Sequence, residues 1–223
     1  MPRLLELFCG TKSVGKVAEQ RGYEVVSLDF NPKFNATITE DIMEWDYTAY
    51  PPDYFDVVWG SPDCRTWSFA TAGKYRTKDE IWGHEDEHQE EATLGGAMIM
   101  RTIEILKYFQ PPKWFIENPR GLLQYYPPLC EFIEEMGAFR GLVYYANYDY
   151  HTPKPTHIWS NMPLWGDEKC REMIEGVDWR WIKHTYSYKG RKKYYINFHS
   201  GAADRPERRS VIPASLIERL FDL

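Results

Sequence analysis

Three polar motifs in this sequence carry groups that could do chemistry, and each follows an apolar run. A glycine turn at Gly10 ends the first run, residues 4–8. The thiol of Cys64 follows the second run, and the carboxyl of Glu117 follows the third. Open parallel sheets gather their chemistry at the carboxyl ends of their strands, so we expect the three groups to meet. Together they predict an enzyme that uses a cofactor and a cysteine nucleophile.

Cys64 is a stronger candidate nucleophile than the other cysteines of the chain. A lone cysteine is most often a small buried hydrophobic residue, and we expect that role for Cys130 and Cys170. Cys64 lies among polar residues and directly before a long polar segment, 65–91. A thiolate is a strong nucleophile once a neighbouring charge or helix end lowers its pKa. No Cys-x-x-Cys pair occurs, so we expect neither a metal site nor a disulfide framework.

The carboxyl of Glu117 has two interpretations that the sequence leaves open. An acid at the end of a strand is often a cap or one half of an ion pair. Beside a nucleophile in a partly dry cleft, its pKa would rise, and it could donate a proton near neutral pH. The Pro119 that follows turns the chain, because proline offers the strand no further donor.

The turn at Gly10 is expected to hold the cofactor. Glycine lets a ligand approach the backbone, and we expect the helix that begins at Ser13 to present unpaired N–H groups to it. Asp29, one strand later, is placed to bind ribose hydroxyls, and Asp41 could accept a hydrogen bond from an adenine amino group. A purely structural turn is the alternative, but the two acids favour a cofactor.

The periodicity of the sequence predicts the scaffold that positions these groups. Short apolar strands alternate with helical patterns, which is typical of an α/β fold with a mostly parallel sheet. The expected strands are residues 4–8, 24–28, 37–38, 55–59 and 113–116, with an antiparallel edge pair at 142–147 and 157–160. The expected helices are residues 13–21, 92–109, 128–136 and 213–223.

The composition is that of a globular protein. A chain of 223 residues, 43% of them apolar, can bury a large core in one domain. No stretch approaches the ~18 uninterrupted apolar residues of a membrane span, and the first residues lack the zones of a signal peptide. We therefore expect an intracellular protein.

The net charge of −6 is unevenly spread. Residues 178–209 contain nine Lys and Arg against three acids, and such local positive charge can bind phosphates on an acidic protein. Within this region, cations alternate with aromatic residues, which suits phosphate contacts and base stacking. A solvated hairpin tip is the alternative. The cations in question are Lys189, Arg191, Lys192 and Lys193.

The segment 65–91 is too long for an ordinary loop of a compact domain. Its second half, 79–91, holds seven acids. Two interpretations remain open here: a solvated acidic helix or loop, and a lid that closes over Cys64.

The motifs occur in the order and spacing of the DNA (cytosine-5) methyltransferase family, which this sequence resembles. The resemblance spans residues 4–220, and the runs 154–161 and 209–213 resemble those of small phage- or virus-type members. The motifs that carry it are Leu7-Phe8-Cys9-Gly10, Gly60-Ser61-Pro62-Asp63-Cys64-Arg65-Thr66-Trp67-Ser68 and Phe115-Ile116-Glu117-Asn118-Pro119.

The resemblance implies the Rossmann-like, doubly wound fold of the class I S-adenosylmethionine-dependent methyltransferases, with S-adenosylmethionine as cofactor. It implies Cys64 as the nucleophile, and Glu117 as the residue that holds the base. The implied cofactor contacts are Phe8, Gly10, Thr11, Lys12, Ser13, Val14, Asp29, Phe30, Asp41, Ile42, Ser61 and Pro62. The implied substrate contacts are Asn118, Arg120, Lys154, Thr156, Lys189, Arg191, Lys192 and Lys193.

The resemblance also implies a division of the chain into three parts. Residues 1–161 would form the catalytic domain, 162–208 a reduced target-recognition region, and 209–223 a segment that packs back on the catalytic domain. The partner would be duplex DNA, and the location would be the cytoplasm of a prokaryotic or virus-infected host cell. We expect the protein to be a monomer.

The implied reaction is methyl transfer to carbon 5 of a flipped cytosine through a covalent cysteine adduct. Two alternatives remain: the same chemistry on RNA, and a homologue that binds DNA or cofactor but has lost catalysis. Three departures from the family motifs bear on this choice. Asp63 replaces the usual proline before the nucleophile, and Lys12 and Ser13 stand where glycines are usual.

Overall fold

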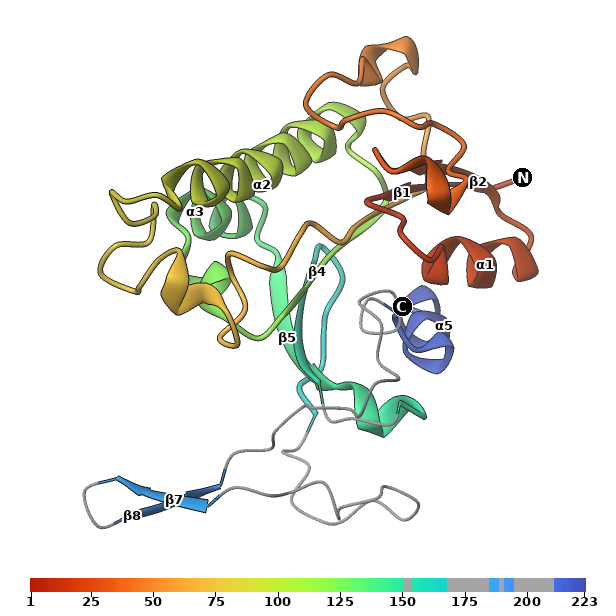
Figure 1. Cartoon of the computed structure of the whole chain (residues 1–223). Coiled ribbons are helices and arrows are strands. Elements are labelled where there is room, and N and C mark those ends of the chain that lie inside the picture. Colours follow the sequence, from red (N-terminus) through yellow and green to blue (C-terminus); the bar gives the residue numbers. More distant parts are fainter. Residues whose placement is uncertain (151–153, 168–184, 189–190, 195–210) are drawn as a thin grey trace.

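A parallel sheet with an antiparallel edge carries the fold (Figure 1). The computed structural model describes residues 1–150, 154–167, 185–188, 191–194 and 211–223. Within these residues, six strands form the main sheet in the order β2-β1-β3-β4-β6-β5. Their bounds are Arg3–Leu7 (β1), Glu24–Leu28 (β2), Val57–Gly60 (β3), Lys113–Pro119 (β4), Phe139–Tyr144 (β5) and Pro155–Ser160 (β6).

The strand directions confirm the predicted α/β class. Strands β2, β1, β3 and β4 run parallel to one another. Strand β6 pairs antiparallel with both β4 and β5, so the predicted antiparallel pair is β5 and β6. Strand β5 is the outermost strand on this side of the sheet. A second, two-stranded sheet joins β7 (Thr185–Tyr188) to β8 (Arg191–Tyr194).

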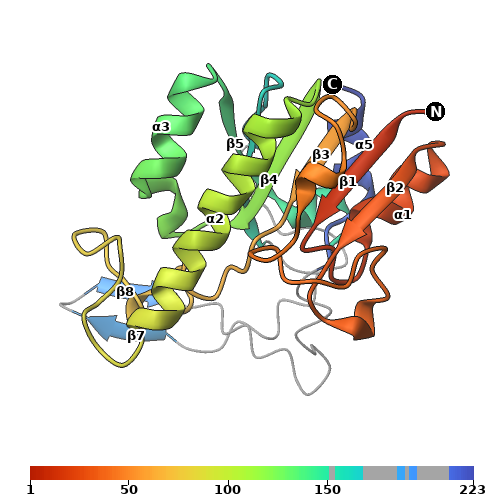
Figure 2. The same cartoon turned by 90° about the horizontal axis from the view of Figure 1, so that it is seen from above.

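Helices cover both faces of the main sheet, as a doubly wound fold requires. Successive residues of a strand point to opposite faces: Val58 packs into the core beneath α2, whereas Val57 and Trp59 pack into the core beneath α1 and α5. Figure 2 shows α2 on one side of the strands and α5 on the other. The helices are Ser13–Gln20 (α1), Gln89–Phe109 (α2), Pro127–Glu135 (α3) and Ala214–Phe221 (α5).

Some predicted boundaries were wrong, each for a local reason. The strand expected at 37–38 is only an isolated parallel bridge between Leu28 and Ile38. Side-chain hydroxyls replace part of its ladder, because Thr37 N–H donates to Ser27 Oγ at 2.9 Å. Helix α2 begins earlier than predicted, at Gln89, with two acids in its first turn, where a helix favours negative charge. Strand β4 continues to Pro119, so Glu117 lies inside a strand.

In the described part of the chain, no helix is both long enough and apolar enough to cross a membrane.

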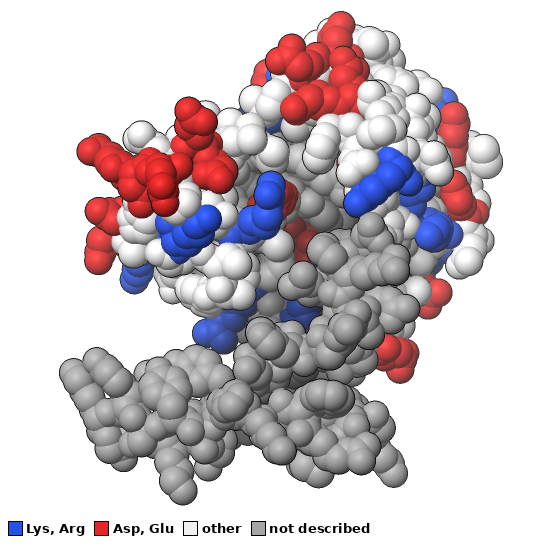
Figure 3. Space-filling model, viewed as in Figure 1, with Lys and Arg blue, Asp and Glu red and all other residues white. Residues whose placement is uncertain are grey.

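The segment 65–91 is neither fully solvated nor detached from the protein. Trp67 and Arg76 have no exposed surface, and Ile81 is also buried. The segment contacts the turn after β4 through an isolated bridge between Ser68 and Gly121. Its acids, in contrast, are exposed, and Figure 3 shows acidic side chains gathered over the end of the molecule where α2 begins. Both earlier interpretations are therefore incomplete, because the first half of the segment is docked.

Gly121 allows this docking, and replacing it tests whether the contact matters. A Cβ at Gly121 would lie 2.0 Å from the Trp67 carbonyl oxygen and 2.8 Å from Ser68 Cα. Because both are backbone atoms, we expect Gly121→Ala to cost about 1–3 kcal/mol of unfolding free energy, as overpacking does. Denaturant unfolding measures this. The matched control is Gly73→Ala, where a Cβ meets nothing within 4 Å. Equal stability of the two variants would contradict the docked arrangement.

Candidate active site

The sheet register brings the three sequence motifs to one edge. Leu7 of β1 is paired with Gly60 of β3, and Gly60 is paired with Ile116 of β4. The loop after β1, the turn that carries Cys64 and the side chain of Glu117 therefore lie at the carboxyl ends of three adjacent strands, as the sequence predicts.

The turn that carries Cys64 is held by backbone and side-chain hydrogen bonds. Asn118 Nδ2 donates to the carbonyl oxygen of Pro62 at 2.9 Å, which joins the turn to β4. The Cys64 carbonyl oxygen accepts the N–H groups of Trp67 and Ser68 at 3.1 and 2.8 Å. Asn118 itself has no exposed surface, so its amide positions the turn from within the protein.

Burial and nearby charge keep the Cys64 thiol protonated at neutral pH. Burial is the largest cause that raises the pKa of Cys64, to about 11, and the negative charge of Glu117 raises it further. The positive charge of Lys154 acts in the opposite direction. The charge of Glu117 in β4 thus acts on Cys64 in the turn after β3.

Glu117 is 6% exposed, and a hydroxyl and an ammonium group contact its carboxyl. Tyr145 Oη donates to Glu117 Oε1 at 2.8 Å, and Lys154 Nζ lies 3.8 Å from the same oxygen. Lys154 Nζ also lies 4.4 Å from the centre of the Tyr145 ring. The ion-pair interpretation of Glu117 is therefore correct, and it leaves Oε2 for a further role.

Tyr145 is a site residue that the sequence analysis missed. It is completely buried, and burial, followed by the charge of Glu117, raises its pKa well above the usual value. Thr156, an expected substrate contact, has no exposed surface. Its hydroxyl donates to the Lys154 carbonyl oxygen at 3.0 Å and also bonds Tyr145. Thr156 thus contacts both partners of Glu117, Lys154 and Tyr145, and helps to position them.

Asp63, the unusual neighbour of the nucleophile, is paired with Arg65. Its carboxyl accepts the Arg65 backbone N–H at 2.9 Å and the Arg65 Nε–H at 2.6 Å. Asp63 still raises the pKa of Cys64, but it is a smaller cause than burial and Glu117. The departure from the family motif therefore leaves the carboxylate directed mainly at a guanidinium.

The loop after β1 is strained in a way that suits a ligand site. Phe8, Gly10 and Lys12 all have left-handed backbones, with φ of 57°, 47° and 56°. Such strain in a bulky residue is rare and gathers at ligand sites. A Cβ at Gly10 would meet only the Phe8 carbonyl oxygen, at 3.9 Å, so the space above this glycine is open.

Asp29 joins the loops that follow β1 and β2. One carboxylate oxygen accepts the Gly10 N–H at 3.0 Å, and the other accepts the Asn31 N–H at 2.9 Å. Asp29 is 8% exposed. Each oxygen keeps a lone pair, so the carboxylate can also accept hydroxyls from a ligand. Its neighbour Phe30 is 71% exposed and offers an aromatic face beside it.

The expectation of unpaired N–H groups at the start of α1 is wrong for two residues. Glu6, a buried residue of β1, accepts the N–H groups of Val14 and Gly15 at 3.2 and 3.0 Å. Burial raises the pKa of Glu6 to about 7 against these hydrogen bonds. Val14, an expected cofactor contact, also lies fully in the core. An internal acid therefore occupies the place that a ligand anion could take.

The remaining expected residues of this loop are bonded to one another or to the next loop. Thr11 Oγ1 and Ser13 Oγ share a hydrogen bond of 2.9 Å, and Ser13 Oγ also accepts the Ile212 N–H at 3.3 Å. The Lys12 ammonium donates to the carbonyl oxygen of Asn35, which follows β2. Lys12 thus links the two loops between which a cofactor would lie.

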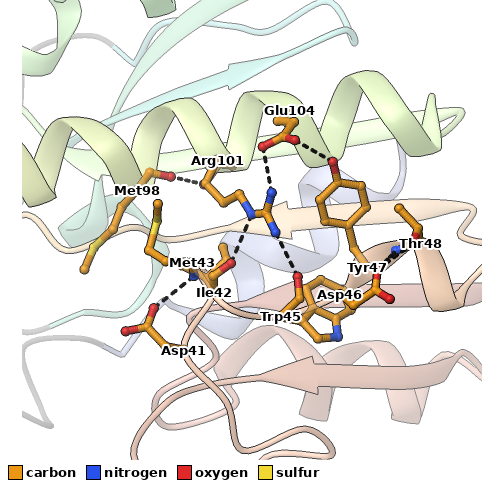
Figure 4. Close-up of polar contacts among 11 residues, drawn as sticks. Asp41, Ile42, Met43, Trp45, Asp46, Tyr47, Thr48, Met98, Arg101 and Glu104 are labelled. Carbon is orange, nitrogen blue, oxygen red and sulfur yellow. Dashed lines mark hydrogen bonds and ion pairs between the residues drawn. The ribbon is translucent and has the colours of Figure 1, made fainter.

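Helix α2 clamps the segment that carries Asp41 (Figure 4). Arg101 donates from Nε to the Ile42 carbonyl oxygen at 3.1 Å and from Nη2 to the Trp45 carbonyl oxygen at 2.9 Å. Glu104 accepts from Arg101 at 2.8 Å and from Tyr47 Oη at 2.7 Å. The sequence analysis missed this clamp, because the acceptors are backbone carbonyls that any sequence has.

The structure places the last expected residues as follows. Ile42 is 4% exposed and belongs to the core, whereas Asp41 is exposed and accepts the Met43 N–H at 3.0 Å. Ser61 Oγ accepts the Trp59 indole N–H at 2.8 Å. Arg120 is exposed, with its guanidinium 6.0 Å from the ring centre of Phe69. Lys189 and the side chains of Arg191, Lys192 and Lys193 lie outside the described residues.

A viral protein matches the chain over its whole length. A protein of Frog virus 3 (isolate Goorha), named "Probable DNA (cytosine-5)-methyltransferase", is 32% identical over 238 residues, which cover 99% of this chain and 99% of the viral protein. No protein-family model matches the chain.

Two solved structures align with part of this chain at low sequence identity. A candidate DNA modification methyltransferase encoded within an E. coli prophage aligns with a TM-score of 0.50 at 13% identity, and the alignment covers 72% of this chain and 46% of that chain. The S. pombe Dnmt2 methyltransferase aligns with a TM-score of 0.48 at 14% identity, over 74% of this chain and 51% of that chain. This chain thus spans about half the length of these two structures.

The electrostatic link between Cys64 and Glu117 predicts that a change at Glu117 affects the thiol of Cys64 but not that of Cys130. Below its pKa, a thiol gains thiolate tenfold per pH unit, so Cys64 alkylation by iodoacetamide should keep rising up to about pH 11. Glu117→Gln removes one cause of the raised pKa. Alkylation of Cys64 at pH 8 should then be about three- to tenfold faster. Peptide mass spectrometry measures this, with the exposed Cys130 as internal control. Equal acceleration of both thiols, or of neither, would contradict the link.

Proposed function

Since the chain belongs to the DNA (cytosine-5)-methyltransferase family, we propose that it transfers a methyl group from S-adenosylmethionine to carbon 5 of cytosine in DNA. The observation that carries this proposal is the placement of Cys64 and Glu117 at adjacent strand ends, where the carboxyl acts on the thiol. The reaction needs both groups at one base, the thiol at carbon 6 and the carboxyl at ring nitrogen 3.

The residues beside this pair fit an adenosine-containing cofactor. The carboxylate of Asp29 can accept ribose hydroxyls, the exposed ring of Phe30 can contact the adenine, and the open backbone at Gly10 admits the ligand closely. Asp41, held by the α2 clamp, can accept from the adenine amino group. Bound there, S-adenosylmethionine supplies an electrophilic methyl group on a sulfonium.

The nucleophilic step belongs to Cys64. Carbon 5 of cytosine is a poor nucleophile until the thiolate adds to carbon 6 and makes carbon 5 enamine-like. The new S–C bond pushes electrons toward ring nitrogen 3. Carbon 5 then takes the methyl group from the sulfonium, which is left as the thioether S-adenosylhomocysteine. Loss of the carbon 5 proton to water reforms the ring double bond and expels the thiolate, and nitrogen 3 returns its proton to Glu117. In a duplex, the base must first leave the stack, which costs a few kcal/mol.

The proton that nitrogen 3 needs is assigned to Glu117. Tyr145 and Lys154 both contact Oε1, so the carboxyl is fixed in orientation, and Oε2 is the oxygen that carries the proton. When the S–C bond forms, the displaced ring electrons move toward nitrogen 3. Because nitrogen 3 is protonated, no negative charge builds up on the base beside Glu117. This is general acid catalysis by a positioned carboxyl.

Lys154 has a second effect in this proposal. Its charge opposes the raised pKa of Cys64 while its ammonium holds Glu117. One cation thus favours the thiolate and orients the acid. The pairing of Asp63 with Arg65 argues against the alternative in which Asp63 disables the thiol. The proposed DNA contacts at residues 189–193 remain a prediction from the sequence.

A trapping assay tests the function directly. Duplex DNA with 5-fluorocytosine should form a covalent adduct with the protein in the presence of S-adenosylmethionine, because fluorine cannot leave carbon 5 as the proton does. Cys64→Ser should abolish the adduct, and Cys130→Ser, which changes an exposed thiol, should not. Gel electrophoresis detects the adduct. Binding without any adduct would favour a homologue that has lost catalysis, and an adduct with RNA alone would favour an RNA substrate.

Turnover tests the acid. Glu117→Gln should lower methyl transfer by about 10²-fold or more, following the usual contribution of general acid catalysis. The matched control is Glu131→Gln on the exposed surface of α3, which should behave like the unmodified chain. Radiolabelled methyl transfer to DNA gives the rate, and S-adenosylhomocysteine binding verifies that both variants are folded. Wild-type turnover in Glu117→Gln would remove this residue from the mechanism.

A further inference from the structure

Arg76 is a buried arginine with no acidic partner among the described residues. It has no exposed surface, and its guanidinium donates to the Ile81 carbonyl oxygen at 2.8 Å, to Thr66 Oγ1 at 3.3 Å and to the Ala92 carbonyl oxygen. Its Nε has no hydrogen-bond partner. A buried charge without a counter-charge is expensive, so packing alone does not explain an arginine here.

The guanidinium lies against Trp67, and this contact is the shortest of its kind in the described structure. The central carbon of the guanidinium is 3.5 Å from the Trp67 ring centre. A cation over a tryptophan face is attracted by the ring electrons, more strongly when both are desolvated. Trp67 is also fully buried, and its indole N–H donates to the Gly95 carbonyl oxygen of α2 at 3.3 Å.

Trp67 joins the two strand ends that carry the reacting groups. Its backbone N–H donates to the Cys64 carbonyl oxygen at 3.1 Å. Its own carbonyl oxygen accepts the Leu122 N–H at 2.7 Å, in the turn that follows β4 and Glu117. A displacement of Trp67 would therefore move the nucleophile relative to the acid.

We propose that Arg76 is a positioning residue: it fixes Trp67, and through it the distance between the Cys64 sulfur and the Glu117 carboxyl. The inference rests on the proposed function, because it assigns Arg76 a role in that reaction. An apolar residue of similar volume would fill the same space, and such replacements of buried charges are often neutral or stabilising. What only the planar fork supplies is simultaneous bonding of Thr66, Ile81 and Ala92, which lie in two separate turns and at the start of helix α2.

Arg76→Met in the full chain tests the proposal, because it keeps the volume and removes the fork. Two quantities are measured: the rate of adduct formation with 5-fluorocytosine duplex at saturating S-adenosylmethionine, and the Kd for S-adenosylhomocysteine by calorimetry. We expect adduct formation to slow at least about tenfold and the Kd to change by less than about twofold. Arg76→Lys keeps the charge but lacks the planar fork. Its rate of adduct formation should lie between those of the unmodified chain and Arg76→Met.

A matched control separates positioning from the general loss of an arginine. Arg21 also donates to a backbone carbonyl, that of Glu218, and it joins α1 to α5 away from the three strand ends. Arg21→Met should therefore leave both the adduct rate and the Kd unchanged. The thermal midpoints of both variants are measured as well. If Arg76 had a purely structural role, Arg76→Met and Arg21→Met would form the adduct at the same rate at temperatures equally far below their midpoints.

A double-variant cycle with Trp67→Phe shows whether Arg76 acts through Trp67. If it does, the double variant should be no slower than the slower single variant, whereas independent effects would multiply. A wild-type adduct rate in Arg76→Met overturns the proposal. If that variant does not fold, wild-type rates in both Arg76→Lys and Trp67→Phe overturn it equally. If the unmodified chain forms no adduct, the proposed function fails instead.

Discussion

The pairing of Glu117 Oε1 with Lys154 and Tyr145 is the interaction on which the rest of this site depends. It keeps a buried carboxyl ordered inside a strand. The charge of this carboxyl helps to raise the pKa of Cys64 at the end of the neighbouring strand. Any change that moves or neutralises Glu117 therefore also changes the pKa of the thiol.

Helix α2 positions both halves of the site from one rigid element. Near its start, the Ala92 and Gly95 carbonyl oxygens hold Arg76 and Trp67, and so the turn that carries Cys64. Two turns further along, Arg101 holds the segment that carries Asp41. A rigid helix fixes the spacing between these anchors, so the proposed cofactor segment and the proposed nucleophile are held relative to each other. A solvated surface loop at residues 65–91 would not hold the turn with Cys64 in this way, because it would lack the contacts of Trp67 and Arg76 with α2.

The sequence predicted the parts of the fold that depend on local patterns. Strand β2 lies where its apolar run placed it, and the groups after β1, β3 and β4 meet as parallel strands require. Partners distant in sequence were not predictable. Arg101 and Arg76 bond backbone carbonyls, which leave no signature in a sequence, and Tyr145 is one of many aromatic residues. The acids of residues 79–91 dominate the composition of the whole segment 65–91, so the sequence did not reveal that Trp67 and Arg76 in its first half are buried.

Glu6 indicates which kind of ligand the loop after β1 is built for. The start of a helix attracts anions, and dinucleotide sites place a pyrophosphate there. In this protein, the Glu6 carboxyl already accepts the N–H groups of Val14 and Gly15, so a ligand phosphate would find them occupied and a buried acid beneath. Adenosine-type contacts remain available at Asp29 and the open backbone of Gly10. The loop after β1 therefore suits an adenosine-containing ligand that places no phosphate at this helix start, which agrees with the cofactor proposed above.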